Sequence, residues 1–249
     1  KIGLGSDGAP VDIIGGAKVS GRLKGYDLGV LIVEQDSYQD VKQKSLFVGR
    51  ISKNINRNTT LGVIHTQGDP RSNNTNSLTG MDLRYRNSST TEDIIEGNIW
   101  YQSSTNDYAM SDEDAFGISL SKPSPRGFRG LLQYQNVGKN FNPALGFVSR
   151  RDVELYRGIL GYVKQLDDHP YIRKIYSGAD TAYWNLKGLN KLQSYTQFYR
   201  LLDVEYHSGD KFNISYVRFG EGIYSENNQP FSNLDIVLPE REYLSLIHI

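Results

Sequence analysis

The segment Met81-Asp82-Leu83-Arg84-Tyr85-Arg86 alternates an apolar side chain with a charged one at every step. Neighbouring side chains of an extended strand point to opposite faces of a sheet, so this period of two separates the apolar residues from the charges. The same alternation recurs over residues 95–101 and 128–135. The sequence therefore predicts strands that each have one apolar and one polar face.

Alternating strands of this kind run along almost the whole chain and are long enough to cross a bilayer at a tilt. A soluble sheet with one solvated face would show a similar pattern, and it is the competing architecture. Recurrence in so many strands is typical of a membrane β-barrel with a wet interior. The predicted fold is all-β, an antiparallel up-and-down transmembrane β-barrel, here a partial barrel of about a dozen strands.

Turn signals set the predicted organisation of the chain, and Lys24-Gly25 predicts a tight turn that joins two strands in a hairpin. Residues 1–12 are rich in glycine and contain Pro10, which predicts a loop or a connection to an upstream domain. Residues 13–244 are predicted to form the outer-membrane β-barrel region, and residues 245–249 a truncated or non-native tail. The strands predicted in the second half include 145–150, 170–179 and 180–187. No segment shows a convincing helical period.

Composition excludes several classes of protein. The 249 residues contain 28 basic and 28 acidic side chains, so no basic excess points to nucleic acid as a partner. The absence of cysteine excludes disulfides, thiolate metal sites and cysteine nucleophiles. No run approaches the roughly 18 apolar residues of a spanning helix, which excludes a helical membrane protein. The 38% hydrophobic content still fits a barrel, because only alternate strand residues touch lipid.

Charged residues at strand centres are the candidate functional positions. A basic side chain that faces lipid at the midplane costs roughly 2–4 kcal/mol, so a barrel would turn these residues into its lumen. They are Lys18, Arg22, Arg50, Asp82, Arg84, Arg86, Glu96, Arg129 and Arg157. Two interpretations stay open: a polar conduit or glycan-contacting wall, and a network of ion pairs that fills the lumen. No catalytic, cofactor-binding or metal-binding residue is predicted.

Three short motifs resemble functional sites but favour loops and turns. The GxGxxG pattern at Gly3–Gly8 lacks the preceding strand and following helix of a dinucleotide site, and Pro10 follows almost at once. The acidic run Asp112–Asp114 lacks the spacing of a calcium loop and favours a solvated hairpin tip. Asp167-Asp168-His169-Pro170 favours a turn, since adjacent strand residues point in opposite directions and rarely share a substrate.

Three segments carry a resemblance to a known family. They are Ile14–Gly21 (IGGAKVSG) with Tyr26–Gly29 (YDLG), Leu46–Arg50 (LFVGR), and Asn142–Asp152 (NPALGFVSRRD). They resemble the large Gram-negative outer-membrane proteins that join an N-terminal family-nine-type carbohydrate-binding module to a C-terminal β-barrel region of unknown function. The resemblance spans about residues 1–165 of this chain. It implies an outer-membrane location, outer-membrane lipid as a partner, and glycans bound through a module upstream of this segment.

Three functions are therefore expected in order. The first is the outer-membrane β-barrel of a glycan-associated envelope protein, which anchors it and passively passes polar solutes. The second is a soluble all-β carbohydrate-binding or interaction module that uses exposed Tyr and Trp side chains, Trp100 and Trp184 among them, as stacking platforms. The third is a fragment of a glycoside hydrolase with two carboxylates across a cleft. No cofactor and no nucleic acid are expected.

Overall fold

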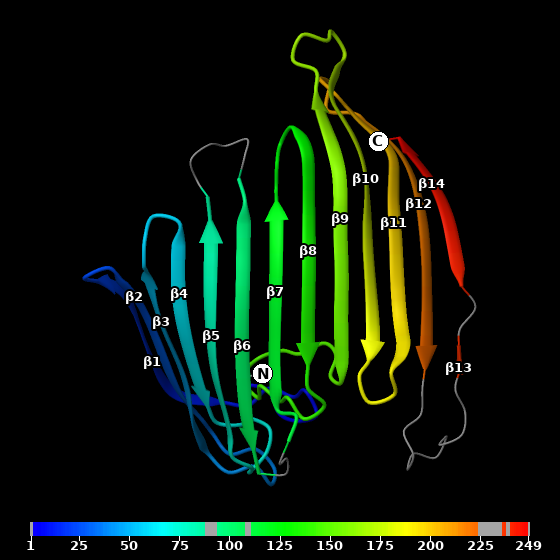
Figure 1. Cartoon of the computed structure of the whole chain (residues 1–249). Helices are drawn as coiled ribbons and strands as arrows, with labels where there is room; N and C mark the ends of the chain where they lie inside the picture. The colour runs from blue at the N-terminus through cyan, green and yellow to red at the C-terminus, as the bar shows by residue number, and fades with distance from the viewer. Residues whose placement is uncertain (1, 88–93, 108–110, 224–235, 238–239, 249) are drawn as a thin grey trace. The chain divides into compact units, whose positions relative to one another are not determined.

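A computed structural model describes residues 2–87, 94–107, 111–223, 236–237 and 240–248. This part of the chain contains only strands and their connections (Figure 1). The strands are β1 (Ile13–Leu23), β2 (Tyr26–Gln35), β3 (Lys44–Asn54), β4 (Thr59–Gln67), β5 (Asn76–Arg86), β6 (Glu96–Asn106), β7 (Asp114–Lys122), β8 (Gly127–Val137), β9 (Val153–Gln165), β10 (Ile172–Leu186), β11 (Lys191–Tyr206), β12 (Lys211–Ile223), β13 (Ile236–Val237) and β14 (Arg241–His248). Among the described residues there is no helix of the length and apolarity that crossing a membrane requires.

The strands pair in the order of the sequence, each with the one before and the one after it, from β1 to β13. β14 pairs with β12, the same strand with which β13 pairs. Every register that the structure defines is antiparallel, and β1 has no partner but β2 among the described residues. The prediction of an all-β, antiparallel, up-and-down fold is confirmed. The sheet is open, because no pairing of described residues joins β1 to the C-terminal strands.

Contacts divide the chain into two compact units. Unit 1 comprises Lys1–Tyr85, Asn98–Gly117 and Asn136–Asp152, and unit 2 comprises Arg86–Gly97, Ile118–Gln135 and Val153–Ile249. The division passes through β5, at its last residue, and through β6, β7 and β8. Each unit thus holds its own run of neighbouring strands and is described by itself.

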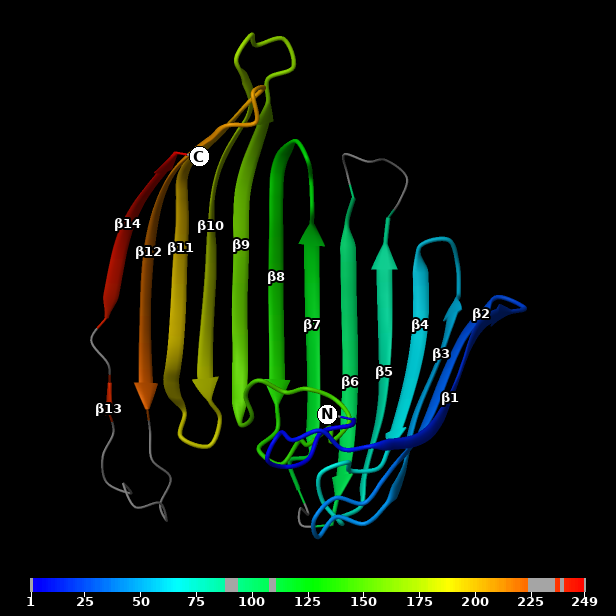
Figure 2. The ribbon, with the colours of Figure 1, turned by 180° about the vertical axis from the view of Figure 1, so that it is seen from behind.

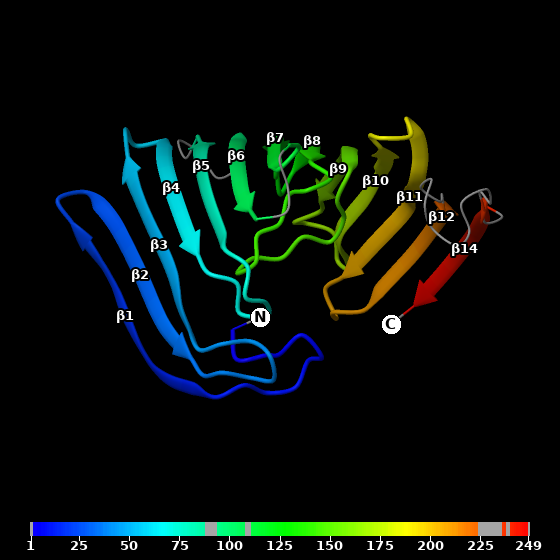
Figure 3. The ribbon, with the colours of Figure 1, turned by 90° about the horizontal axis from the view of Figure 1, so that it is seen from below.

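The β1–β2 hairpin of unit 1 shows how the local sequence determines the register. Lys24 and Gly25 form a two-residue turn with φ angles of 49° and 83°. Positive φ at both positions belongs to the turn whose twist matches antiparallel strands, and glycine reaches it without strain. The predicted tight turn is confirmed, and Figure 3 shows β1 and β2 side by side. Their register places Val19 opposite Val30.

The apolar face of each unit remains exposed. In unit 1 the register places Val63 opposite both Ile51 and Met81, and all three are exposed. Other exposed apolar residues of unit 1 strands with the same alternation are Val19, Leu23, Leu28, Val30, Ile32, Leu61, Leu83, Ile99 and Phe116. Those of unit 2 are Ile118, Leu120, Phe128, Leu132, Leu160 and Tyr162. No second layer of described residues covers these side chains.

Unit 1 has one small apolar core, built where a loop folds back on the strand ends. Leu78, Ala115 and Phe141 are buried together. Trp100, Val137 and Val148 pack against them as half-buried neighbours. Figure 2 shows segment 138–152, which carries Phe141, crossing the ends of β6 and β7.

The prediction of a strand at 145–150 is wrong, because this segment belongs to the loop 138–152. Its start is held by backbone bonds, from Gly138 N to Asp114 O and from Asn140 N to Asp112 O. Gly146 N then donates to the Pro143 carbonyl and closes a turn within the segment. The short apolar run here packs as a loop rather than pairing in the sheet.

The two strands predicted at 170–179 and 180–187 are one strand, β10. It pairs with β9 on one side and with β11 on the other. Gly178, at the expected break, stands opposite Gly161 of β9. The ring of Tyr176 covers both glycines, since a Cβ at Gly161 would lie 2.6 Å from the Tyr176 hydroxyl. An aromatic ring over paired glycines supplies packing that the glycines themselves lack.

Candidate functional site

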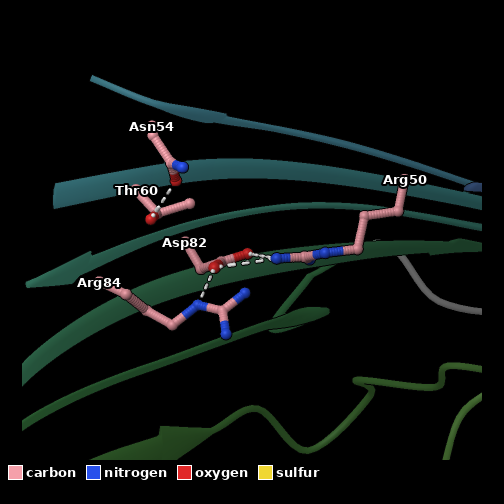
Figure 4. Close-up of polar contacts among 5 residues, drawn as sticks. All are labelled: Arg50, Asn54, Thr60, Asp82 and Arg84. Carbon is pink, nitrogen blue, oxygen red and sulfur yellow. Dashed lines mark hydrogen bonds and ion pairs between the residues drawn. The ribbon is translucent and has the colours of Figure 1, made fainter. Parts of the chain in front are cut away.

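The polar face of unit 1 holds a three-residue charge network at its strand centres (Figure 4). Arg50 of β3 donates from Nη2 to both carboxylate oxygens of Asp82 on β5, at 3.0 and 2.6 Å. Arg84 Nε donates to Asp82 Oδ1 at 3.1 Å. Asp82 is the least exposed member, with 15% of its side-chain surface accessible, so one carboxylate neutralises two guanidinium groups at a half-buried point.

Gly62 of β4 allows this network to cross an intervening strand. β4 lies between β3 and β5, and Gly62 is the register partner of Asp82. A Cβ at Gly62 would lie 2.5 Å from Arg50 Nη2 and 2.6 Å from Asp82 Oδ2. A glycine inside a strand often marks such a close approach, and this is the signal by which the sequence marks the network.

The remaining candidates of unit 1 lie on β1. Arg22 donates from Nε to Asp27 Oδ1 on β2 at 2.6 Å, across the hairpin turn. Both side chains are exposed. Lys18 is exposed on the same strand, and no ion pair of the described residues includes it. Exposed pairs of this kind add little to stability, because water screens them, so they mainly determine the charge of the surface.

The candidates of unit 2 fall into two ion pairs and one aromatic contact. Arg86 Nη1 lies 3.4 Å from Glu96 Oε1. Arg157 donates to both oxygens of Asp180, at 3.0 and 2.7 Å, in a two-pronged pair between β9 and β10. Arg129 differs, because its guanidinium carbon lies 5.8 Å from the centre of the Tyr176 ring.

The structure therefore brings most of the predicted residues to carboxylate partners. Arg50, Asp82 and Arg84 form one network, and Arg86 pairs with Glu96. Sequence reasoning did not single out the partners Asp27 and Asp180. They could be found only through the register, because the side chains that pair are set by strand alignment.

A buried amide network, missed from the sequence, pins the loop 138–152 to unit 1. Asn76 is 4% exposed. Its Nδ2 donates to Asn106 Oδ1 at 2.5 Å and to the Asn142 carbonyl at 2.8 Å, while its Oδ1 accepts from Ala144 N at 3.1 Å. Buried amides must be satisfied in this way, so the network determines the loop's position.

The acidic run 112–114 takes part in the same structure. Glu113 Oε1 accepts from Asn106 N at 3.0 Å and from Asn106 Nδ2 at 2.8 Å. Asp112 Oδ2 accepts from Lys139 N at 2.7 Å. These carboxylates bind protein amides, and the described residues contain no group of three or more His, Cys, Asp or Glu side chains suited to a metal ion.

The GxGxxG pattern forms a loop held to the sheet, as predicted. Gln35 is buried, accepts from Gly3 N at 2.9 Å and donates to the Pro70 carbonyl at 2.9 Å. The Asp7 carboxylate accepts from Ala9 N and from the Tyr38 hydroxyl. These bonds, the Ala9 amide first, lower the pKa of Asp7.

The sequence Asp167-Asp168-His169-Pro170 forms the predicted turn and shows no acid–base pair. Asp167 Oδ2 lies 2.6 Å from Arg126 Nη2. His169 Nδ1 accepts from the backbone amides of Tyr171 and Ile172. The Asp167 carboxylate and the His169 imidazole thus bind different partners.

A polar cleft of about 390 Å³ lies at the loop end of unit 1. Its lining includes Lys44, Asp69, Asn74, Thr75 and Thr105. Asp69, the one carboxylate of this lining, accepts from Arg71 N and from Ser72 Oγ. A cleft with one internally bonded carboxylate does not provide the pair that glycoside hydrolysis needs.

The two tryptophans of the predicted sugar platform are both half-buried. Trp100 lies over Gly117, where a Cβ would approach Trp100 Nε1 to 2.6 Å. The ring is used for packing in unit 1.

Comparisons with protein-family models, curated proteins and solved structures found no match for this chain. Its functional assignment rests on its own residues.

Proposed function

We propose that this chain is the membrane-spanning sheet of a Gram-negative outer-membrane protein, where it anchors the protein and passively admits polar solutes along its polar face. The observation that carries the proposal is the exposed apolar face. Leu132 and Leu160 of unit 2 are 68% and 64% exposed, and Val19 of unit 1 is 69% exposed. Contiguous apolar surface of this kind marks an interaction site, and lipid matches its alternation strand by strand.

The polar face supports the same proposal. Its charges are largely matched in pairs, as for Arg50 with Asp82 and Arg157 with Asp180. A charged side chain that faces lipid near the bilayer midplane is strongly disfavoured, whereas a wall that faces a wet lumen carries polar groups at the same depth. Loop lengths in unit 1 also agree with a membrane barrel, which has short turns at one end and longer loops at the other. The turn at 24–25 has two residues, and the loop 138–152 at the other end has many more.

The open edge of the sheet sets a requirement on the proposal. The outer backbone groups of β1 have no partner among the described residues. Each unsatisfied backbone group costs several kcal/mol in hydrocarbon. We therefore propose that this edge is paired with further strands in the membrane.

The association with glycans is supported by the resemblance of the three segments in residues 1–152 alone.

Insertion into vesicles tests the proposal. The chain, unfolded in urea and diluted into short-chain phosphatidylcholine vesicles, is expected to float with the lipid after an alkaline wash and to give a β-sheet circular dichroism spectrum. Dilution into buffer without lipid or detergent is expected to give aggregates, because the apolar face stays uncovered. A folded, monodisperse monomer in plain buffer would instead support a soluble module.

A further inference from the structure

One cleft of unit 2 contains arginines without carboxylate partners. It has a volume of about 230 Å³. Its charged and aromatic lining consists of Arg129, Lys174, Tyr176, Arg200 and Asp203. These side chains come from three strands, β8, β10 and β11. The cleft is separate from the Arg157–Asp180 pair, which is not part of its lining.

Both arginines of the cleft contact one aromatic ring. The guanidinium carbons of Arg129 and Arg200 lie 5.8 and 5.6 Å from the centre of the Tyr176 ring. Arg200 also lies 5.3 Å from the Phe198 ring. Within the described residues neither arginine takes part in an ion pair, whereas Arg50, Arg84 and Arg157 all do. The ring positions the two cations and leaves their N–H donors available.

The acidic groups nearby do not neutralise these arginines. Lys174 Nζ is matched by Glu205 Oε2 at 2.8 Å, and Arg173 uses the other oxygen of Glu205 at 2.9 Å. Asp203 is the one carboxylate of the lining, against two unmatched guanidinium groups. The cleft therefore has an excess of positive charge, and guanidinium donors favour an oxygen-rich anion.

We propose that this cleft binds an oxyanion, a phosphate or carboxylate group, between Arg129 and Arg200. Guanidinium groups present parallel N–H donors that fit such groups with two bonds each. Tyr176 holds both arginines near one point, because its own ring is packed against Gly161 and Gly178. The group is either a phosphate monoester or the carboxylate of an acidic sugar. The proposal concerns the strand face itself and holds whether or not the sheet lies in lipid.

Calorimetric titration of the full chain with two probes, inorganic phosphate and glucuronate, tests the site, with the chain folded in detergent micelles so that it does not aggregate. At least one probe is expected to bind at a single site. Arg129→Gln and Arg200→Gln are each expected to weaken binding about tenfold or more, since each removes charge-assisted bonds. Stronger binding of phosphate identifies a phosphate ligand, and stronger binding of glucuronate identifies an acidic sugar.

Two controls separate the site from general charge and from misfolding. Arg84→Gln removes the same charge from a residue of unit 1 that is paired with Asp82, and it is expected to leave the affinity within twofold. Circular dichroism checks that each variant keeps its sheet. The proposal is overturned if the wild-type chain binds neither probe, or if Arg84→Gln weakens binding as much as Arg200→Gln does.

Discussion

Replacement of Ile118 by lysine is expected to destabilise the chain inserted in lipid vesicles by roughly 2–4 kcal/mol. Ile118 lies near the centre of β7 on the apolar face and is 50% exposed. A lysine that faces hydrocarbon near the midplane costs roughly 2–4 kcal/mol. The measurement is the free energy of unfolding in vesicles, from urea titrations of the wild-type and Ile118→Lys chains.

The neighbouring residue provides the matched control. Ser119 follows Ile118 on β7 and points to the opposite face. Ser119→Lys adds the same charge at the same depth and is expected to change the free energy of unfolding much less. For a soluble sheet, a lysine at an exposed position such as 118 would change stability by only about 0.5 kcal/mol. Equal effects of the two substitutions would therefore contradict the membrane assignment.

Replacement of Phe141 by alanine is expected to destabilise unit 1 by about 3–5 kcal/mol, the usual loss for a buried phenylalanine. Phe141 is 3% exposed and packs against Leu78 and Ala115. The substitution leaves a cavity beneath the loop 138–152, and only the polar contacts, the amide network around Asn76 and the bonds to Asp112 and Asp114, would then hold the loop. Urea unfolding followed by tryptophan fluorescence measures the loss, since Trp100 packs against this core.

Phe147 gives the control within the same loop. It is 84% exposed. Phe147→Ala removes the same side chain without a buried contact and is expected to change stability by about 0.5 kcal/mol or less. If both substitutions cost the same, the loop is not anchored by a core, and the packing described for Phe141 is wrong.

The alternation of the sequence predicted most of the strands and which of their side chains share a face. Met81 to Arg86 showed which side chains share a face, and the Lys24-Gly25 turn indicated the first hairpin. Both are local signals, because the two-residue period of a strand and the conformation of a tight turn depend on residues that are neighbours in the sequence. The open sheet was not predictable in this way, since closure depends on pairing between strands far apart.

The failures have a common physical cause. The segment 145–150 looked like a strand, but Phe141 and the bond from Ala144 N to Asn76 hold it as a loop across 68 positions of sequence. Residues 170–187 were predicted as two strands that meet at 179 and 180, but the ring of Tyr176 and pairing on both sides keep β10 continuous. Long-range packing overrides local preference in both cases.

The candidate site was predicted as a set of charges and not as a set of contacts. The sequence placed Arg129 and Arg157 at strand centres. In the structure Arg157 lies near the middle of β9, whereas Arg129 lies near the start of β8. It did not distinguish their environments, although Arg157 is paired with Asp180 and Arg129 lies by Tyr176. That difference arises from strand register, which also places Arg200 beside the same ring.

Spin labels along β7 test the membrane assignment most directly. The chain has no cysteine, so single cysteines at Ile118, Ser119, Leu120 and Ser121 each give one labelled position. In vesicles, labels at 118 and 120 are expected to collide with oxygen dissolved in lipid, and labels at 119 and 121 with a water-soluble nickel chelate. Equal access of the nickel chelate at all four positions would contradict an apolar face that meets hydrocarbon.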